Sequence, residues 1–345
     1  MSSRRKALTR KDYVAGIQQS DRSILGRTIT LIESNAPEHI GLAQDVLSEL
    51  MPLTGQSIRI GITGIPGAGK STLIEALGLH LVEAGHRVAV LAVDPTSGLS
   101  GGSILGDKTR MEQLSRSPDS FIRPSPSGGA LGGVARKTRE SMLVCEAAGY
   151  DVILIETVGV GQSEVSVRSL VDFFLLLQIP GGGDELQGIK RGIIEIADAI
   201  LINKADGDNV QRARAARSEF EMAIHYLMPV TTGWQTRVRT CSALTGEGIP
   251  ELWQTIQRFK DITVRNGFFQ RRRSEQARTW MRTILQDQVM HLFLASPRIK
   301  TLAEKLEAQV VADRLPPTHA ARQLIEAFEE QWSGETPDRV KNRTR

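Results

Sequence analysis

Nine residues, from Gly64 to Thr72, constrain the fold of this chain more than any other segment. They fit the pattern G-x-x-x-x-G-K-[ST], whose glycines let backbone N–H groups turn inward around phosphates. Residues 58–63 before the pattern have the composition of a short buried strand, and residues 73–81 after it have helical apolar spacing. A strand, a phosphate loop and a helix in this order predict an α/β fold with a helix N-terminus facing a nucleotide.

The loop residues have separate expected roles. Lys70 reaches the β- and γ-phosphates, and the Ser71 hydroxyl is placed to hold Mg²⁺. We therefore expect the whole loop to bind nucleotide: Gly64, Ile65, Pro66, Gly67, Ala68, Gly69, Lys70, Ser71 and Thr72.

Strand-like and helical segments alternate from residue 57 to about 263. This order predicts a P-loop NTPase fold of the α/β class, with a mostly parallel sheet flanked by helices on both faces. The candidate strands are 58–63, 87–93, 151–156, 171–178, 199–203 and 237–241.

The two ends of the chain have helical patterns instead. Residues 9–52 read as two helical stretches separated at Asn35-Ala36-Pro37, and residues 264–333 are interrupted at Pro297 and at Pro316-Pro317. Their apolar faces need a partner, either the central domain or another subunit. The expected fold thus has N- and C-terminal helical extensions.

A second motif, Asn203-Lys204-Ala205-Asp206, follows the candidate strand at 199–203 and selects the base. Guanine offers two N–H donors on one edge, and the Asp206 carboxylate can accept both. Adenine lacks the exocyclic N2 amine and would leave that carboxylate unpaired, which costs several kcal/mol. We expect Lys204 to lie along the base plane and Asn203 to brace the surrounding loops.

Ser242-Ala243-Leu244 follows the last candidate strand, 36 residues after Asp206. It matches the loop whose backbone N–H receives the guanine O6. Together with the phosphate loop and the N-K-x-D motif, all in this order and all after strands, it predicts a GTP site.

Acidic residues after two further strands predict the metal site. Glu156 ends one apolar strand where most GTPases carry Asp, and Gly159 lies three residues later, able to give its N–H to the γ-phosphate. Asp94 ends another strand at the same edge, and Asp107 lies in a glycine-rich loop that is typical of a switch. Lys70, Asp107 and Gly159 are the candidate catalytic residues.

Composition argues against several other classes of protein. The pI of 9.2 comes from the ends, because residues 1–12 carry a net charge of +4 and residues 334–345 carry +2, which leaves about −2 of the total +4 for the rest. We therefore expect no nucleic-acid partner. Cys145 and Cys241 are far apart and form no C-x-x-C pair, which indicates core thiols in a reducing compartment.

No apolar run approaches the roughly 18–20 residues that a membrane span needs. Helical character already begins near residue 9, which leaves few residues for a presequence. We expect a cytoplasmic protein without a membrane partner.

Four segments resemble the MeaB/ArgK/MMAA group of P-loop GTPases, and the likeness extends to about residue 330. The segments are Asp94 to Ser97, Gly101 to Arg110, Glu156 to Glu164 and Pro180 to Gly192. Members of this family are homodimeric GTPases that act as chaperones of adenosylcobalamin-dependent acyl-CoA mutases, chiefly methylmalonyl-CoA mutase. An older label, a kinase for an amino-acid transport protein, also attaches to some of them.

The resemblance implies a chaperone that couples GTP turnover to cofactor loading and to protection or rescue of a mutase, without binding cobalamin itself. It implies Mg²⁺ contacts from Ser71, Asp94, Asp107 and Glu156. It also implies a third switch at 180–192 that signals nucleotide state to the mutase, with Asp184, Gln187 and Lys190 as its candidate residues.

The domains expected from these motifs are an N-terminal helical extension (1–56), a GTPase domain (57–263), a C-terminal helical dimerisation arm (264–333) and a flexible basic tail (334–345). Val160 stands directly after Gly159, where Ras-like proteins place a glutamine, and Gln162 comes two residues later. Intrinsic hydrolysis is therefore expected to be slow until a partner reshapes the switches.

Three other functions fit the phosphate loop less well. A nickel-type metallochaperone would carry His-rich tracts or paired cysteines, whereas this chain has six scattered His. A kinase does not need guanine selectivity, and a ParA-like ATPase would carry a lysine where this loop has Ile65. We expect the Arg271-Arg272-Arg273 run to be a solvated helix face rather than a nucleic-acid patch, with a dimer or mutase contact as the open alternative.

Overall fold

The computed structural model describes residues 8–93, 111–124, 131–157, 167–181 and 191–334. They form two compact units, residues up to 276 and residues from 277 onward. The first unit contains a seven-stranded sheet with the order β3-β2-β4-β1-β5-β6-β7, in which every neighbouring pair is parallel. The strands are β1 (Ile58–Gly64), β2 (Val88–Val93), β3 (Ser120–Arg123), β4 (Val152–Thr157), β5 (Phe173–Gln178), β6 (Ala199–Ile202) and β7 (Arg237–Thr240).

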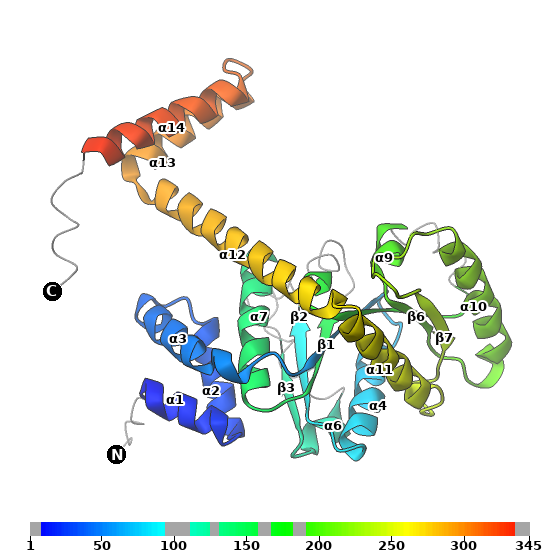
Figure 1. Ribbon diagram of the computed structural model, residues 1–345. Coiled ribbons are helices and arrows are strands. Elements are labelled where there is room, and N and C mark those ends of the chain that lie inside the picture. Colours follow the sequence, from blue (N-terminus) through cyan, green and yellow to red (C-terminus); the bar gives the residue numbers. More distant parts are fainter. Residues whose placement is uncertain (1–7, 94–110, 125–130, 158–166, 182–190, 335–345) are drawn as a thin grey trace. The chain divides into compact units, whose positions relative to one another are not determined.

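Helices cover both faces of this sheet (Figure 1). One face packs against α7 (Leu131–Ala147), α9 (Arg191–Ile196) and α10 (Val210–His225). The other packs against α4 (Lys70–Glu83), α6 (Glu112–Arg116) and α11 (Ile249–Arg265). The central strands are mostly apolar, and β5 is buried at every position, as expected for parallel strands covered on both sides. The predicted fold class is confirmed.

The N-terminal extension contains three helices, α1 (Arg10–Gln18), α2 (Arg22–Glu33) and α3 (Pro37–Leu50), followed by the 3₁₀ turn η1 (Met51–Leu53). The break near residue 36 was predicted, and Pro37 indeed begins α3. The break between α1 and α2 was not predicted. Ser20 has a positive φ of 57°, and the Asp21 carboxylate then caps α2 by accepting from the N–H groups of Ser23 and Ile24. These helices pack on one another and against α7.

The strand expectations agree with the structure except at β3. This strand has four residues, pairs only with β2, and lies between Pro118 and Pro124. Its run of apolar residues, Phe121-Ile122, is too short to show a strand period. Its pairing with β2 in the folded structure is what identifies it as a strand.

The second unit contains the remainder of α12 (Phe268–Ala295), then α13 (Pro297–Val311) and α14 (Pro317–Gly334). Both predicted breaks occur at helix starts. The Ser296 hydroxyl caps α13 by accepting from Ile299 N–H, and proline fits the first helical position because its missing N–H would have no partner there. Helices α13 and α14 pack together, with an ion pair of 3.0 Å between Arg298 and Glu330.

A network of charged side chains lies at the amino-terminal edge of the sheet, opposite the strand ends that carry the sequence motifs. We call it the amino-edge cluster. Its members come from β1, α7, the turns before β5 and β6, and the first two turns of α12: Arg59, Glu146, Arg168, Asp172, Asp198, Arg272 and Arg273.

Arg273 is central to this cluster. Its guanidinium forms a bidentate pair with Asp172 (2.6 and 2.8 Å) and also donates to the carbonyls of Gly55 and Ser57. Arg272 donates to the Asp172 carbonyl and to Thr231. Burial and the nearby Arg168 charge lower the pKa of Arg272 to about 10.

The prediction of a solvated face at 271–273 is therefore wrong for two of its three arginines. The side chains of Arg272 and Arg273 are only 12% and 15% exposed, whereas Arg271 is exposed. The sequence run gave no sign of this difference, because the partners Asp172 and Asp198 lie about a hundred and about seventy positions away.

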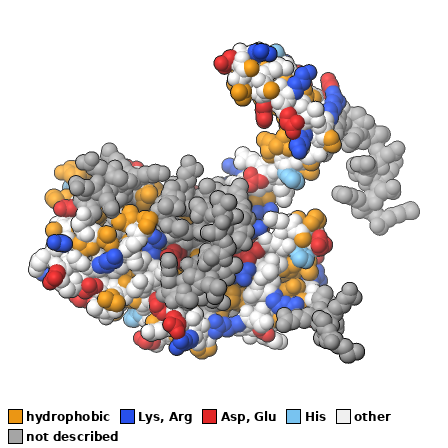
Figure 2. Space-filling model, turned by 180° about the vertical axis from the view of Figure 1, so that it is seen from behind, with side chains coloured by type: hydrophobic (Ala, Val, Ile, Leu, Met, Phe, Trp, Pro, Cys, Tyr) orange, Lys and Arg blue, Asp and Glu red, His pale blue; other side chains and the backbone are white. Residues whose placement is uncertain are grey.

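The described surface mixes both signs of charge. On the face shown in Figure 2, Lys and Arg side chains are interspersed with Asp and Glu. In the described residues, no helix is both long enough and apolar enough to span a bilayer.

Candidate functional site

The described nucleotide motifs lie at one edge of the sheet. The phosphate loop follows β1, Glu156 lies near the end of β4, Asn203 follows β6, and Ser242 follows β7. Because all seven strands are parallel, their carboxyl ends meet at this edge, where doubly wound proteins bind ligands.

The phosphate loop leads directly into α4, which begins at Lys70. Gly69 has a φ of 88°, and a Cβ atom there would lie 2.6 Å from the Asn203 Nδ2 atom, so only glycine fits. The Lys70 side chain is buried over the loop and donates to the carbonyls of Gly64 (2.9 Å) and Ile65 (3.2 Å). This places its ammonium beside the loop that would wrap the phosphates.

Two of the four expected metal ligands are in contact. The Ser71 hydroxyl donates to a carboxylate oxygen of Glu156 over 3.0 Å. A hydroxyl and a carboxylate are hard oxygen ligands, and Mg²⁺ in nucleotide sites typically takes one or two of these together with phosphates and waters. The pair therefore fits Mg²⁺, although no group of three or more His, Cys, Asp or Glu that could hold a metal occurs in the described part of the chain.

Asn203 connects the two halves of the site. Its amide Nδ2 donates to the Ala68 carbonyl in the phosphate loop (2.8 Å), and its Oδ1 accepts from the Ala243 N–H (3.0 Å). Asn203 is only 2% exposed, so these bonds are shielded from water. The side chain thus fixes the phosphate loop relative to the loop expected at the guanine O6.

The expected base-recognition residues also meet. The Ser242 hydroxyl donates to Asp206 and accepts from the Thr245 N–H (3.1 Å), which orients the carboxylate. Lys204 adopts a positive φ of 58°, and the Ala205 N–H donates to the Cys241 carbonyl (3.0 Å). This sharp turn after β6 presents Asp206 at the same edge as the phosphate loop.

The remaining residues of the phosphate loop and of the Ser242-Ala243-Leu244 loop differ in solvent exposure. Ala68 and Ala243 are buried, whereas Pro66, Gly67, Thr72 and Leu244 are exposed, Leu244 by 81%. Six predicted residues lie outside the described part of the chain: Asp94, Asp107, Gly159, Asp184, Gln187 and Lys190. Their assigned roles remain predictions.

Cys241 contributes to the site in a way that the sequence did not indicate. Its thiol lies 3.4 Å from Asn203 Oδ1, on the buried side of the base-recognition loop. Burial, together with the Asp206 charge, raises the pKa of Cys241 to about 12, so the thiol stays protonated and can donate. Both cysteines are free and buried, as expected from their spacing.

Two polar side chains outside the motifs, His86 and Arg139, are fixed by their neighbours. His86 forms a 2.6 Å contact with Asp151 and packs against Trp253. Arg139 is buried and donates to the carbonyls of Ser169 (2.6 Å) and Gln276 (2.7 Å). These bonds connect α7 to the turn before β5 and to α12.

Comparison with known proteins finds relatives that are named GTPases. A family model described as methylmalonyl Co-A mutase-associated GTPase MeaB matches residues 25–298. A relative from Caulobacter vibrioides is 56% identical over 308 residues, covering 89% of this chain and 94% of the relative. GTPase ArgK of Escherichia coli is 46% identical, covering 94% of this chain and 98% of that protein.

The chain is also similar to an animal protein and to a solved structure. The methylmalonic aciduria type A homolog of Mus musculus, a mitochondrial protein, is 45% identical over 91% of this chain and 78% of its own length. A crystal structure titled LAO/AO transport system kinase superposes with a TM-score of 0.77 at 39% identity, covering 95% of this chain and all of that one.

Proposed function

Because the chain belongs to the MeaB family of mutase-associated P-loop GTPases, we propose that it is a GTP-driven chaperone of an adenosylcobalamin-dependent acyl-CoA mutase. In this proposal, GTP turnover is coupled to cofactor loading and to protection or reactivation of a mutase of the methylmalonyl-CoA type. The observation that carries it is the Asn203 side chain, which joins the phosphate loop to the Ala243 loop, in a chain whose family match spans residues 25–298.

In this proposal, the described residues of the carboxyl edge bind the nucleotide. Asp206, oriented by Ser242, accepts the two N–H groups of guanine, and this contact excludes adenine. Lys70 supplies positive charge to the β- and γ-phosphates, where negative charge develops during transfer. Ser71 and Glu156 would hold Mg²⁺, which neutralises phosphate charge when bound.

Slow intrinsic hydrolysis is part of the proposal. With Val160 directly after Gly159, the sequence offers no glutamine at that position to orient the attacking water. In this proposal the mutase reshapes the switch segments, including Asp107 and the 180–192 segment, and thereby completes the catalytic arrangement.

We also propose that the helical arm forms a homodimer. The C-terminal half of α12 carries an exposed apolar stripe whose residues recur every three or four positions: Met281, Leu285, Val289 and Leu292, each between 55% and 63% exposed. An exposed apolar stripe is stabilised when another apolar surface packs on it, and a second copy of the same helix supplies a complementary surface. Replacing Leu285 by Asp is expected to convert the dimer to a monomer in light scattering coupled to size exclusion.

The partner is tested by binding. The tagged full chain, loaded with a non-hydrolysable GTP analogue or with GDP, is mixed with purified methylmalonyl-CoA mutase and analysed by size exclusion. We expect co-elution that depends on the nucleotide, and a GTPase rate that rises when the mutase is present.

A matched control separates the two parts of the proposal. Asp206→Asn should lose the GTP-dependent response, whereas Asp208→Asn, two positions away and exposed, should retain it. If no adenosylcobalamin-dependent mutase associates in either nucleotide state, the chaperone role is wrong while GTP hydrolysis stands.

A further inference from the structure

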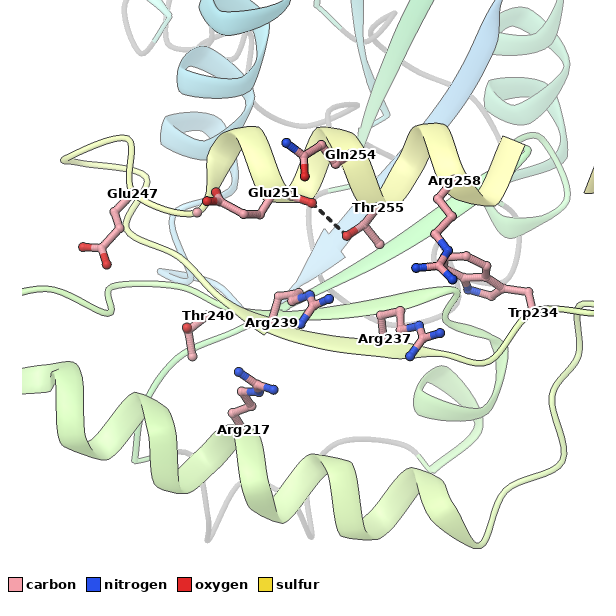
Figure 3. Close-up of a pocket in the computed structure, with 11 residues that line it drawn as sticks. Arg217, Trp234, Arg237, Arg239, Thr240, Glu247, Glu251, Gln254, Thr255 and Arg258 are labelled. Carbon is pink, nitrogen blue, oxygen red and sulfur yellow. Dashed lines mark hydrogen bonds between the residues drawn. The ribbon is translucent and has the colours of Figure 1, made fainter. Parts of the chain in front are cut away.

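A cavity of about 520 Å³ lies at the outer edge of the sheet, beside β7 and between α10 and α11 (Figure 3). β7 is the last strand in the sheet order, so one of its sides has no neighbouring strand among the residues that the structure describes. A volume of several hundred Å³ is typical of sites for small molecules. None of the nucleotide-binding residues described above lines this cavity.

Four arginines from three elements line the cavity. Arg217 comes from α10, Arg237 and Arg239 come from β7, and Arg258 comes from α11. In Figure 3, Arg217 points up from α10 toward β7, and Arg258 points down from α11 toward Arg237. Convergence of like charges in one concave site raises the local positive potential.

Three of these four arginines form no ion pair with a described carboxylate, unlike the arginines of the amino-edge cluster. Arg217 pairs with Glu221 on its own helix (2.9 Å), and Arg237 lies 5.8 Å from the Trp234 ring centre. Arg239 and Arg258 make no hydrogen bond or ion pair with any described residue. Their donors are available to a ligand.

The acidic residues of the cavity do not neutralise it. Glu247 and Glu251 also line it, but neither forms an ion pair with the four arginines in the described structure. Four arginines and two glutamates give a net charge of 4 − 2 = +2. A phosphate group carries close to two negative charges at neutral pH, which matches this balance, and its oxygens fit the planar fork of a guanidinium.

The loop between β7 and α11, which lines part of the cavity, has a constrained backbone. Gly248 has a φ of 83°, and a Cβ atom there would lie 2.7 Å from the Thr240 carbonyl, so the chain between β7 and α11 requires glycine. The Ser242 N–H donates to the Glu247 carbonyl (2.9 Å), which closes this loop. The same loop carries the base-recognition residues on its other side.

We propose that this cavity binds a phosphorylated small molecule, at a site separate from the GTP site. Arg239 and Arg258 provide its principal contacts, with Arg217 and Arg237 adding charge. This inference does not depend on a mutase partner.

The test uses the full-length protein saturated with GDP and Mg²⁺, so that the nucleotide site is already filled. Inorganic pyrophosphate is titrated by calorimetry at about 0.15 M salt, with equal Mg²⁺ in both solutions. We expect one site per chain, and a loss of affinity of about tenfold or more in Arg239→Gln/Arg258→Gln, because two charge-assisted contacts disappear.

The control is Arg212→Gln/Arg214→Gln, which removes the same charge from α10 outside the cavity and should leave pyrophosphate binding unchanged. Unchanged GDP affinity shows that both double variants are folded. The proposal is overturned if wild-type protein binds no pyrophosphate, or if both double variants lose affinity equally. It is also overturned if a hexaglutamate peptide, but not pyrophosphate, binds in an Arg239- and Arg258-dependent way, since that would indicate an acidic segment of a partner at the edge of β7.

Discussion

The carboxyl edge and the amino edge of this sheet are both rich in polar side chains, but these side chains are arranged differently at the two edges. At the carboxyl edge, Lys70, Asn203 and Asp206 are held in place by neighbours, and we propose that they bind a ligand of fixed shape. At the amino edge, Arg273 and Asp172 are directed toward each other and toward nearby carbonyls. A ligand dictates residue types, whereas self-complementary pairs can be built in many ways. This explains why one edge is evident in the sequence and the other is not.

The comparison predicts that the edges can be altered separately. Variants at the carboxyl edge should change nucleotide chemistry with little effect on folding, and variants at the amino edge should do the reverse. A variant that changed both equally would show that the edges are coupled.

The largest effect is expected from Lys70→Ala. Removing the ammonium that stabilises charge on the phosphates should lower the rate of GTP hydrolysis by about 1,000-fold. Phosphate release at saturating GTP and Mg²⁺ measures this rate. Lys305→Ala, on α13, is the control and should retain full activity. Hydrolysis by Lys70→Ala within tenfold of wild type would remove Lys70 from the catalytic residues.

Next in size is Arg273→Gln at the amino edge. It leaves the Asp172 carboxylate, which is 2% exposed, without its bidentate partner, and this should lower the free energy of unfolding by about 3 kcal/mol. Urea denaturation measures the loss. Arg271→Gln removes the same charge from the exposed neighbour and should change stability by less than about 0.5 kcal/mol. Equal losses in the two variants would contradict the assigned role of Arg273.

A smaller change is expected from Asp206→Asn. The amide offers one acceptor where the carboxylate offered two, so GTP binding should weaken by about 2 kcal/mol, or roughly 30-fold. Xanthine carries a carbonyl in place of the guanine amine, so xanthosine triphosphate should gain affinity. Fluorescent-nucleotide competition measures both. Adenosine nucleotides binding wild-type protein as tightly as guanosine nucleotides would overturn the base assignment.

The smallest effect concerns acid stability of the amino edge. Burial opposes the charged form of Glu146, but hydrogen bonds from Arg59, the Ser57 hydroxyl and the Gly55 N–H outweigh it, so the pKa of Glu146 lies below its usual 4.5. A depressed carboxyl pKa stabilises the fold above the unfolded pKa, and this contribution is lost as the pH falls through the folded value.

Glu146→Gln should therefore reduce stability at pH 7 and flatten its decline below about pH 4.5. Thermal unfolding between pH 3 and pH 7 measures the slope. Glu112→Gln, an exposed carboxylate on α6, should keep the wild-type profile. A Glu146→Gln profile parallel to wild type across this range would rule out Glu146 as the source of acid sensitivity.

Sequence reasoning was most successful where local pattern and chemistry agreed. The predicted strand after residue 57, the phosphate loop and the helix from Lys70 are consecutive, so no distant information was needed. It missed β3, whose four residues form a strand only by pairing with β2. It also missed the break at Ser20, because a positive φ at a serine has no clear sequence signal.

The sequence by itself determined the fold class and predicted the base-recognition residues, because phosphate and guanine impose residue types at fixed spacings. Only the tertiary structure decided which arginines are paired. Arg272 and Arg273 meet carboxylates brought from distant turns, whereas Arg239 and Arg258 converge on a cavity without them. The physical reason is that charge pairing depends on distances in space, which the order of residues in a chain does not specify.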